Sequence, residues 1–137
     1  MERTLAMIKP DAYRGKLIGQ VITRIEEAGF RIGQLKRILW TDTAAANFYG
    51  VHKGKDFFEH NLEFIMSGPC VMLILYKDNA VAELRKLIGP TDCSEPGTIR
   101  GDFGKNDGVM HENIIHASDS IENAEWEIYQ IGMEGII

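Results

Sequence analysis

The sequence N-I-I-H-A-S-D-S, residues 113–120, predicts the end of a strand, then a histidine, then the start of a helix. Ile114 and Ile115 are apolar and β-branched, as strands favour, and residues 118–120 are of types that cap helix N-termini. Apolar residues then recur at helical spacing from position 121 to position 131. His116 would thus be held by a rigid element and open to a ligand, which suits a nucleophile or a base. A histidine that only packs is the competing interpretation.

Outward from this stretch, strand-like and helix-like segments alternate. Strands are predicted at 4–8, 30–40, 70–76 and 110–115, the third apolar enough to be buried on both faces. Apolar periodicity predicts helices at about 18–28, 44–49 (capped by Thr43), 56–66, 81–88 and 120–132. The long aperiodic segment 91–109 is expected to be a functional loop. This order favours an α/β plait, that is, a ferredoxin-like, four-stranded antiparallel sheet with helices packed on it.

Composition and charge narrow the class of protein. The 137 residues fit one globular domain, and we expect residues 1–137 to form it. The net charge of −5 argues against nucleic acid as an obligate partner, although a phosphorylated ligand needs only a local basic cluster. Cys70 and Cys93 have neither disulfide nor metal-site spacing, which fits a reducing compartment. Neither a signal peptide nor a membrane span is recognisable, so we expect a cytoplasmic location and no membrane partner.

Familiar phosphate and metal motifs are absent from the sequence. It contains no P-loop, no G-x-G-x-x-G after a strand, and no metal-ligand spacing of histidine and cysteine. Polar residues instead stand at the ends of predicted elements, where a plait can bring them together. These residues are Lys9, Tyr49, Arg85, Thr91, Arg100, Asn113 and His116. Arginine forks and a lysine around one histidine would bind a polyphosphate, although each cation alone is more often a solvated surface charge.

Five blocks of sequence, in this order, closely resemble the nucleoside diphosphate kinase family. They are T-L-A-M-I-K-P-D-A, F-Y-x-x-H-x-x-K-x-F-F, S-G-P, P-G-T-I-R-G-D-F and N-I-I-H-A-S-D-S. The resemblance extends from Thr4 to about Glu127, and the last block is highly specific to the family. It implies an enzyme that passes the γ-phosphate of ATP, or another nucleoside triphosphate, to a nucleoside diphosphate and so maintains the NTP and dNTP pools.

The resemblance implies five catalytic residues. His116 would be the nucleophile and would carry a phosphohistidine in a ping-pong cycle. Lys9 would contact the transferring phosphate and the ribose, and Tyr49 would donate a hydrogen bond nearby. Glu127 would accept a hydrogen bond from the other ring nitrogen, with Ser118 placing Glu127. A carboxylate beside one ring nitrogen of His116 keeps the proton on that nitrogen, which leaves the lone pair of the other ring nitrogen free to attack phosphorus.

The resemblance also implies how the nucleotide is held. Arg85, Thr91 and Arg100 would bind the β- and γ-phosphates. Asn113 would reach the ribose, and Phe57 would stack on one face of the base. Stacking in place of base-edge hydrogen bonds explains how one site could accept several bases. Mg²⁺ would arrive on the nucleotide phosphates, with few direct protein ligands.

The chain departs from the family pattern at several positions. Asn61 stands where leucine is usual near the base, His111 where a small residue is common, and Val51 where an acid is frequent. We hypothesise that Asn61 and His111 flank the nucleoside and bias base or sugar preference. The segment 91–100 is slightly shorter than is common, and it forms subunit contacts in hexameric members. A homo-oligomer is expected, a hexamer or alternatively a tetramer or dimer.

Two other classes of function fit a plait of this size. One is a non-catalytic nucleotide-binding or regulatory module, and the other is a single-strand nucleic-acid binder of the RRM type. Against the first stands the retention of His116 together with Lys9, Arg85, Arg100 and Glu127. The acidic net charge and the lack of an aromatic RNP-like strand argue against the second.

Overall fold

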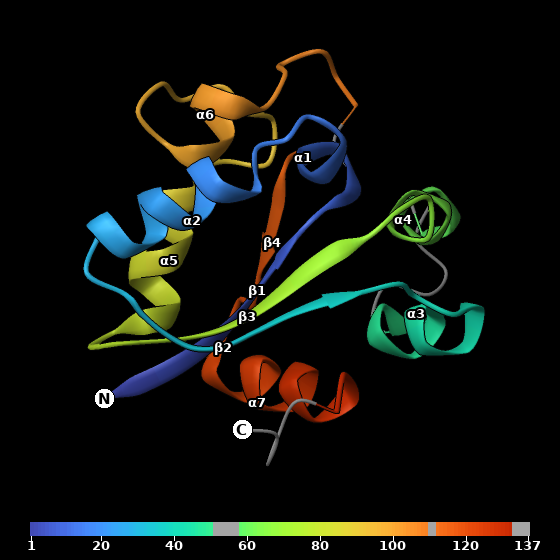
Figure 1. Cartoon of the computed structure of the whole chain (residues 1–137), viewed down its shortest axis with the longest axis horizontal. Helices are drawn as coiled ribbons and strands as arrows, with labels where there is room; N and C mark the ends of the chain where they lie inside the picture. Colours follow the sequence, from blue (N-terminus) through green and yellow to red (C-terminus); the bar gives the residue numbers. More distant parts are fainter. Residues whose placement is uncertain (51–57, 110–111, 133–137) are drawn as a thin grey trace.

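A four-stranded antiparallel sheet forms the centre of the molecule in this computed structural model, which describes residues 1–50, 58–109 and 112–132 (Figure 1). The strands are β1 (Glu2–Ile8), β2 (Arg31–Ile38), β3 (Cys70–Lys77) and β4 (Ile115–Ala117). Their order is β2-β3-β1-β4, and each neighbouring pair is antiparallel. The chain therefore has the predicted ferredoxin-like α/β fold.

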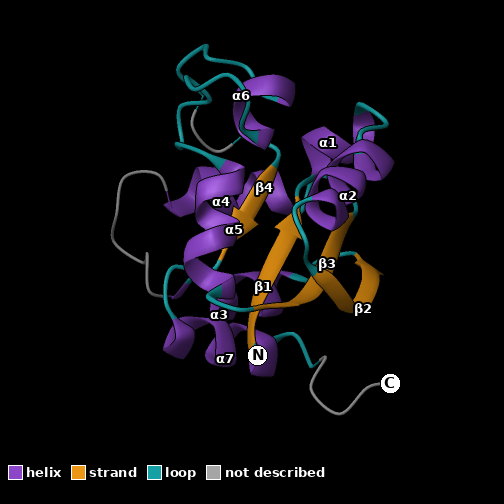
Figure 2. Ribbon diagram, turned by 90° about the vertical axis from the view of Figure 1, so that its left-hand side faces the viewer, coloured by secondary structure: helices purple, strands orange, loops and turns teal. Residues whose placement is uncertain are grey.

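Helices cover both faces of the sheet (Figures 1 and 2). One core contains side chains of α2 (Ile18–Glu27), α5 (Ala80–Ile88) and α6 (Ile99–Phe103). The other contains side chains of α3 (Asp42–Phe48), α4 (Phe58–Ile65) and α7 (Ile121–Gln130). A short helix, α1 (Pro10–Arg14), follows β1 directly. None of the helices in the described part of the chain is both long and apolar enough to span a membrane.

The two central strands are apolar on both sides because each side meets a layer of helices. In β1, Ala6 and Ile8 pack into the first core, whereas Leu5 and Met7 pack into the second. The prediction that β3 is buried on both faces is confirmed, since Cys70 to Leu75 are all buried. Met7 is the register partner of His116. Because side chains of paired residues share a face of the sheet, His116 points toward the second core.

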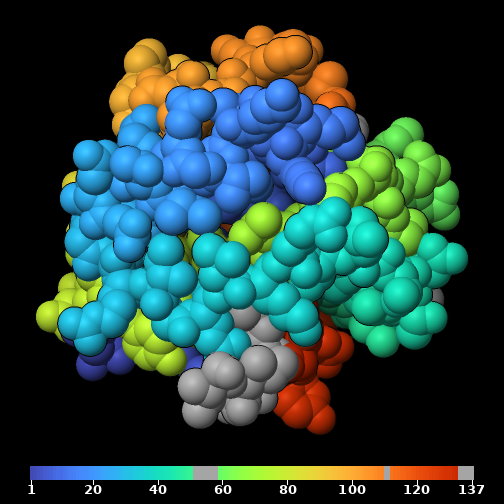
Figure 3. All heavy atoms as spheres, viewed as in Figure 1, coloured from blue at the N-terminus to red at the C-terminus, as the bar shows by residue number. Residues whose placement is uncertain are grey.

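The segment that carries Arg100 is fastened to α2. Arg24 forms an ion pair with Asp102 of α6, at 2.9 Å, and donates to the carbonyl oxygen of Gly97 at 2.7 Å. Its guanidinium also lies over the ring of Phe103. Figure 3 shows the atoms around α6, in orange, resting on the blue N-terminal part of the chain. This contact gives the Arg100 segment a rigid base.

Some sequence predictions of local structure were wrong. The last strand, predicted at 110–115, is Ile115–Ala117, so His116 lies within it. The segment 91–109 contains α6, which has only five residues and therefore shows no periodicity. Pro10 does not merely break β1 but occupies the first turn of α1, where its missing N–H costs nothing. Thr41, rather than Thr43, caps α3 by accepting from the backbone N–H of Ala44 at 3.2 Å.

Candidate active site

His116 meets a carboxylate held by a buried serine. Its Nε2 lies 3.1 Å from Oε1 of Glu127, on α7. Ser118 is fully buried and donates its hydroxyl to the same oxygen at 2.6 Å. An ionised carboxylate can only accept, so the ring proton is on Nε2 and the lone pair is on Nδ1. The arrangement fixes the ring and presents Nδ1 as its nucleophilic atom.

Two aromatic residues at the end of α3 flank the ring of His116. The Phe48 and Tyr49 rings lie edge-on to it, with centroid separations of 5.6 and 6.2 Å. Tyr49 is 6% exposed, and burial raises the pKa of its phenol. The phenol therefore stays neutral at physiological pH and remains a hydrogen-bond donor. These rings limit the imidazole's freedom and give the site an apolar wall.

Lys9 follows β1 and is joined to two segments far along the chain. Its Nζ donates to Oδ1 of Asn113 at 2.7 Å, and Nδ2 of Asn113 donates to the carbonyl oxygen of Thr91 at 3.1 Å. Burial, together with the positive charge of Arg100, lowers the pKa of Lys9 to about 8, against an opposing effect of Asp11. Lys9 is therefore still mainly protonated at pH 7, although burial and Arg100 both disfavour its charged form.

Arg100 is fixed by backbone carbonyl groups. It donates to Ile115 at 2.7 Å, to Gly89 at 3.1 Å and to Asn113 at 3.3 Å. Burial lowers the pKa of Arg100 to about 10, which still leaves the group cationic at neutral pH. Arg85, on α5, makes a longer contact of 3.5 Å with the carbonyl oxygen of Ala117. Both guanidinium groups are thus placed beside the strand that carries His116.

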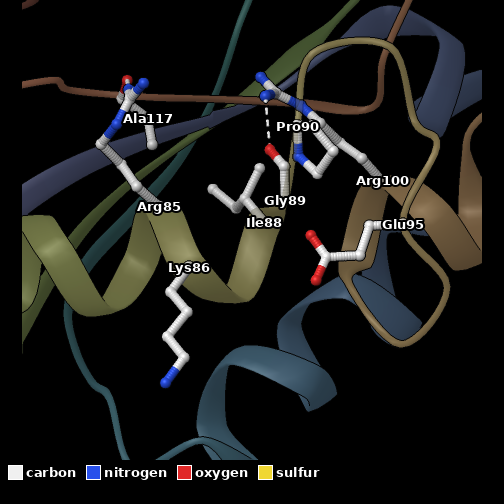
Figure 4. A pocket seen from close by; sticks show the side chains of 8 residues that line it. All are labelled: Arg85, Lys86, Ile88, Gly89, Pro90, Glu95, Arg100 and Ala117. Atoms are coloured by element: carbon white, nitrogen blue, oxygen red, sulfur yellow. Dashed lines mark hydrogen bonds between the residues drawn. The ribbon is translucent and has the colours of Figure 1, made fainter.

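A cavity of about 360 Å³ lies between these two arginines and the end of α5 (Figure 4). Its lining residues are Arg85, Lys86, Ile88, Gly89, Pro90, Glu95, Arg100 and Ala117. Three of these are cationic, so the cavity favours an anionic ligand despite Glu95. Gly89 has a φ of +89°, and a β-carbon there would overlap the side chain of Thr98. The cavity wall can therefore approach the loop closely only because this position is glycine.

The backbone just before His116 is strained. Ile114 has a φ of +77°, and the N–H of Ile115 donates to the carbonyl oxygen of Asn113 at 2.9 Å, which closes a three-residue γ-turn. A β-branched residue with this φ costs about 1–3 kcal/mol and persists only where the surroundings impose it. Sequence reasoning missed both this turn and Asp11, which accepts from the Ile114 N–H at 3.0 Å. The only signal was an acidic residue after Lys9-Pro10.

Most of the predicted site residues come together in one region. They are Lys9, Tyr49, Arg85, Thr91, Arg100, Asn113, His116, Ser118 and Glu127. Thr91 enters this network through its carbonyl oxygen, whereas Asn61 is half-buried on α4. Phe57 and His111 lie outside the described residues. Among the residues that are described, no group of three or more His, Cys, Asp or Glu side chains could hold a metal ion.

Comparisons with known proteins agree on one family. A family model described as nucleoside diphosphate kinase matches residues 2–131. A nucleoside diphosphate kinase from Prosthecochloris aestuarii is 52% identical over 129 residues, which cover 93% of this chain and 89% of that protein. The crystal structure of the Aquifex aeolicus nucleoside diphosphate kinase is similar with a TM-score of 0.90 and 41% identity, over 97% of both chains. A halophilic nucleoside diphosphate kinase from Halobacterium salinarum, in complex with CDP, has a TM-score of 0.88 and 36% identity over 94% of this chain and 86% of that one.

Proposed function

The chain belongs to the nucleoside diphosphate kinase family, and from this premise we propose that it transfers the γ-phosphate of a nucleoside triphosphate to a nucleoside diphosphate through a phosphohistidine on His116. Membership makes it an enzyme of the transferase class that handles nucleotides. The observation that carries the mechanism is the contact of His116 Nε2 with Glu127. It leaves Nδ1 unprotonated and in a fixed direction, as a nucleophile requires.

In the first half-reaction, the Nδ1 lone pair attacks the γ-phosphorus. The N–P bond forms while the bond from the γ-phosphorus to the bridging oxygen breaks, and the nucleoside diphosphate leaves with those electrons. The imidazole then carries a proton on Nε2 and a phosphoryl group on Nδ1, so it is cationic, and the Glu127 carboxylate stabilises that charge. In the second half-reaction, a terminal oxygen of another nucleoside diphosphate attacks the phosphorus, and the electrons of the N–P bond return to His116.

The charged and hydroxyl groups around His116 serve as fixed donors to the transferring phosphoryl group. Phosphoryl transfer spreads negative charge over the equatorial oxygens, and donors that are already in place stabilise it without reorganisation. Lys9 and Tyr49 would donate to this group. Arg85 and Arg100, which line the cavity of Figure 4, would hold the phosphates beside it. The carbonyl contacts that fix Arg100 support this assignment, because they orient its guanidinium before a ligand arrives.

We assign the remaining nucleotide contacts on the basis of family membership. Thr91 would add a phosphate contact, and Asn113 with Lys9 would reach the ribose. Phe57 would stack on the base, with Asn61 and His111 beside it. The relative that was solved with CDP shows that a member of the family binds a nucleoside diphosphate. Here we propose nucleoside di- and triphosphates as the ligands.

A divalent cation, which we propose is Mg²⁺, would accompany the nucleotide. Apart from the Glu127 carboxylate, which is taken up by His116 and Ser118, the polar side chains proposed for this site are guanidinium, ammonium, phenol and amide groups, which suit phosphate oxygens better than a metal ion. Mg²⁺ prefers oxygen ligands and is commonly bound through substrate phosphates, so the phosphate oxygens would hold it. When bound, it would neutralise charge on the β- and γ-phosphates.

We also propose that the whole of residues 1–137 is one catalytic domain, located in the cytoplasm, that maintains NTP and dNTP pools as a homo-oligomer. The edge strand β2 supports the proposal of a homo-oligomer. The side chain of Leu35, on β2, is 53% exposed, and that of Leu39, just beyond β2, is 63% exposed. An edge strand with apolar side chains is suited to contact a second copy. Light scattering on the purified protein would distinguish a hexamer from a tetramer, a dimer or a monomer.

Incubation with γ-labelled ATP and Mg²⁺ tests the proposed function. We expect label on the protein that is labile in acid and stable in base, and that leaves when GDP or CDP is added. The variant His116→Asn should take up no label, whereas His60→Asn, on the exposed face of α4, should behave like the wild type. An unlabelled wild-type protein, or label that persists in His116→Asn, would contradict the mechanism.

A further inference from the structure

Asp11 is a carboxylate with a contact that the proposed mechanism does not use. It lies in the first turn of α1, two residues after Lys9. Its Oδ2 accepts from the backbone N–H of Ile114 at 3.0 Å. Its Oδ1 is buried, without a hydrogen-bond partner among the described residues. Burying a carboxylate oxygen without a hydrogen-bond partner costs free energy, which the rest of the fold must offset.

The partner of Asp11 is the centre of the strained turn before His116. Ile114 is buried, with a φ of +77°, and both of its backbone groups are bound by the β1–α1 junction. Asp11 accepts from its N–H, and the N–H of Lys9 donates to its carbonyl oxygen at 2.8 Å. The junction that supplies Lys9 to the site therefore also clamps the turn that leads to the nucleophile.

We propose that Asp11 is a positioning residue that holds the 113–115 turn in its strained conformation, and so sets Asn113 against Lys9 and His116 against Glu127. The proposal rests on the proposed function and adds to it a residue that touches no substrate. The geometry supports it because Asn113 begins the turn and His116 follows it, so a change at Ile114 moves both. A misplacement of about 1 Å at a reacting group can cost about 10²-fold in rate.

The charge of Asp11 has a second effect, on Lys9. The charged and titratable groups that face Lys9 are Arg100, Asp11, Cys70 and Cys93. Burial and Arg100 lower the pKa of Lys9, and Asp11 opposes them. Removing the charge while keeping a hydrogen-bond acceptor should therefore separate positioning from electrostatics.

Three variants make this separation. Asp11→Ala removes both the acceptor and the charge, whereas Asp11→Asn keeps an oxygen for the Ile114 N–H and removes only the charge. Asp78→Asn, in the exposed turn before α5, is the matched control. The measurement is single-turnover labelling of the protein by γ-labelled ATP, over a range of ATP concentrations and of pH, together with amide hydrogen exchange at Ile114.

We expect Asp11→Ala to slow the maximal labelling rate by about 10²-fold. The ATP concentration that gives half of this rate should change less than about threefold, because Arg85 and Arg100 are unchanged. Exchange of the Ile114 amide should accelerate in this variant. Asp11→Asn should lose less than about tenfold at pH 7, and its rate should begin to fall at a lower alkaline pH than that of the wild type. Asp78→Asn should match the wild type throughout.

Three results would overturn the proposal. The first is a maximal labelling rate of Asp11→Ala within about twofold of the wild type. The second is an Ile114 amide that exchanges at the same rate in Asp11→Ala and in the wild type. The third is an Asp11→Asn variant that labels as slowly as Asp11→Ala and has the pH profile of the wild type. Should Asp11→Ala not fold, the double variant Asp11→Ala/Ile114→Gly decides, because glycine adopts the positive φ without strain. The reference is Ile114→Gly alone, so that the loss of the buried isoleucine side chain counts equally in both proteins. Adding Asp11→Ala to Ile114→Gly should leave folding and the labelling rate unchanged, and a double variant that folds or labels much worse than Ile114→Gly overturns the proposal. A wild-type protein that takes no label refutes the proposed function instead, while amide exchange still reports on the turn.

Discussion

Replacing Lys9 by methionine should stabilise the protein while abolishing phosphoryl transfer. Lys9 is 8% exposed, and burial with Arg100 lowers its pKa from 10.5 to about 8. Each pH unit of that difference corresponds to about 1.36 kcal/mol, so keeping the ammonium group charged in the folded protein costs about 3 kcal/mol. The variant leaves Oδ1 of the buried Asn113 without its donor, which costs about 1–3 kcal/mol. A net gain of up to about 2 kcal/mol in the free energy of unfolding at pH 7 is expected.

The pH dependence of this gain has a definite sign. Between pH 8 and pH 10.5 the unfolded chain binds the Lys9 proton and the folded protein does not. The wild type therefore becomes more stable as the pH rises through this window, and the advantage of Lys9→Met disappears. Below pH 8 the advantage is complete. The same titration predicts that the wild-type transfer rate falls above pH 8, as the ammonium group is lost.

Urea unfolding at pH 7 and pH 9.5, followed by circular dichroism, measures these differences. Lys36→Met on the exposed surface of β2 is the control, since its effect should not depend on pH. A Lys9→Met protein less stable than the wild type at pH 7 would refute the reasoning. So would a stability difference that is the same at both pH values.

Three further substitutions test other parts of the site. Glu127→Gln should slow single-turnover labelling of the protein by about 10²-fold because the tautomer is no longer imposed, whereas Glu122→Gln, exposed on the same helix, should not slow it. Arg100→Lys should raise the KM for ATP by about tenfold in steady-state assays, and near wild-type kinetics would contradict the role of its three carbonyl contacts. Gly89→Ala should lower the free energy of unfolding by about 1–3 kcal/mol, because φ is +89° and the new methyl overlaps Thr98; an unchanged melting temperature would show that the loop yields.

The sequence predicted the parts of the fold whose signal repeats along the chain. β3 is apolar on both faces, and α5 places an apolar side chain at each inward position. Both elements can therefore be predicted from their own residues, without knowing which distant segments they contact. The short helices α1 and α6 escaped because five residues are too few for a period to show. β4 was misplaced because two adjacent isoleucines favour a strand, whereas Ile114 takes a left-handed conformation. The backbone groups of Ile114 are bound by Asp11 and Lys9, about a hundred positions away, and local sequence carries no sign of these contacts.

Much of the site was predictable for a different reason. Strand ends gather at one edge of a plait, so polar residues at those ends were expected to meet, and Lys9 does meet Asn113. The contact of His116 with Glu127 depends on which face α7 covers and on the register of β4 with β1. Spacing alone indicates neither, and it was the family resemblance that pointed to Glu127. No pattern in the sequence indicated that Arg100 would be held by carbonyl groups.

The hydrogen bond between Lys9 and Asn113 joins residues 104 positions apart. His116, the proposed nucleophile, lies on an edge strand of only three residues, β4, which pairs with β1. A ribosome-bound chain that has not yet released β4 and α7 therefore has a nearly complete sheet but no catalytic centre. Loss of the proposed activity on heating should accordingly follow detachment of β4 from β1, so that phosphoryl transfer would report whether these two strands are paired.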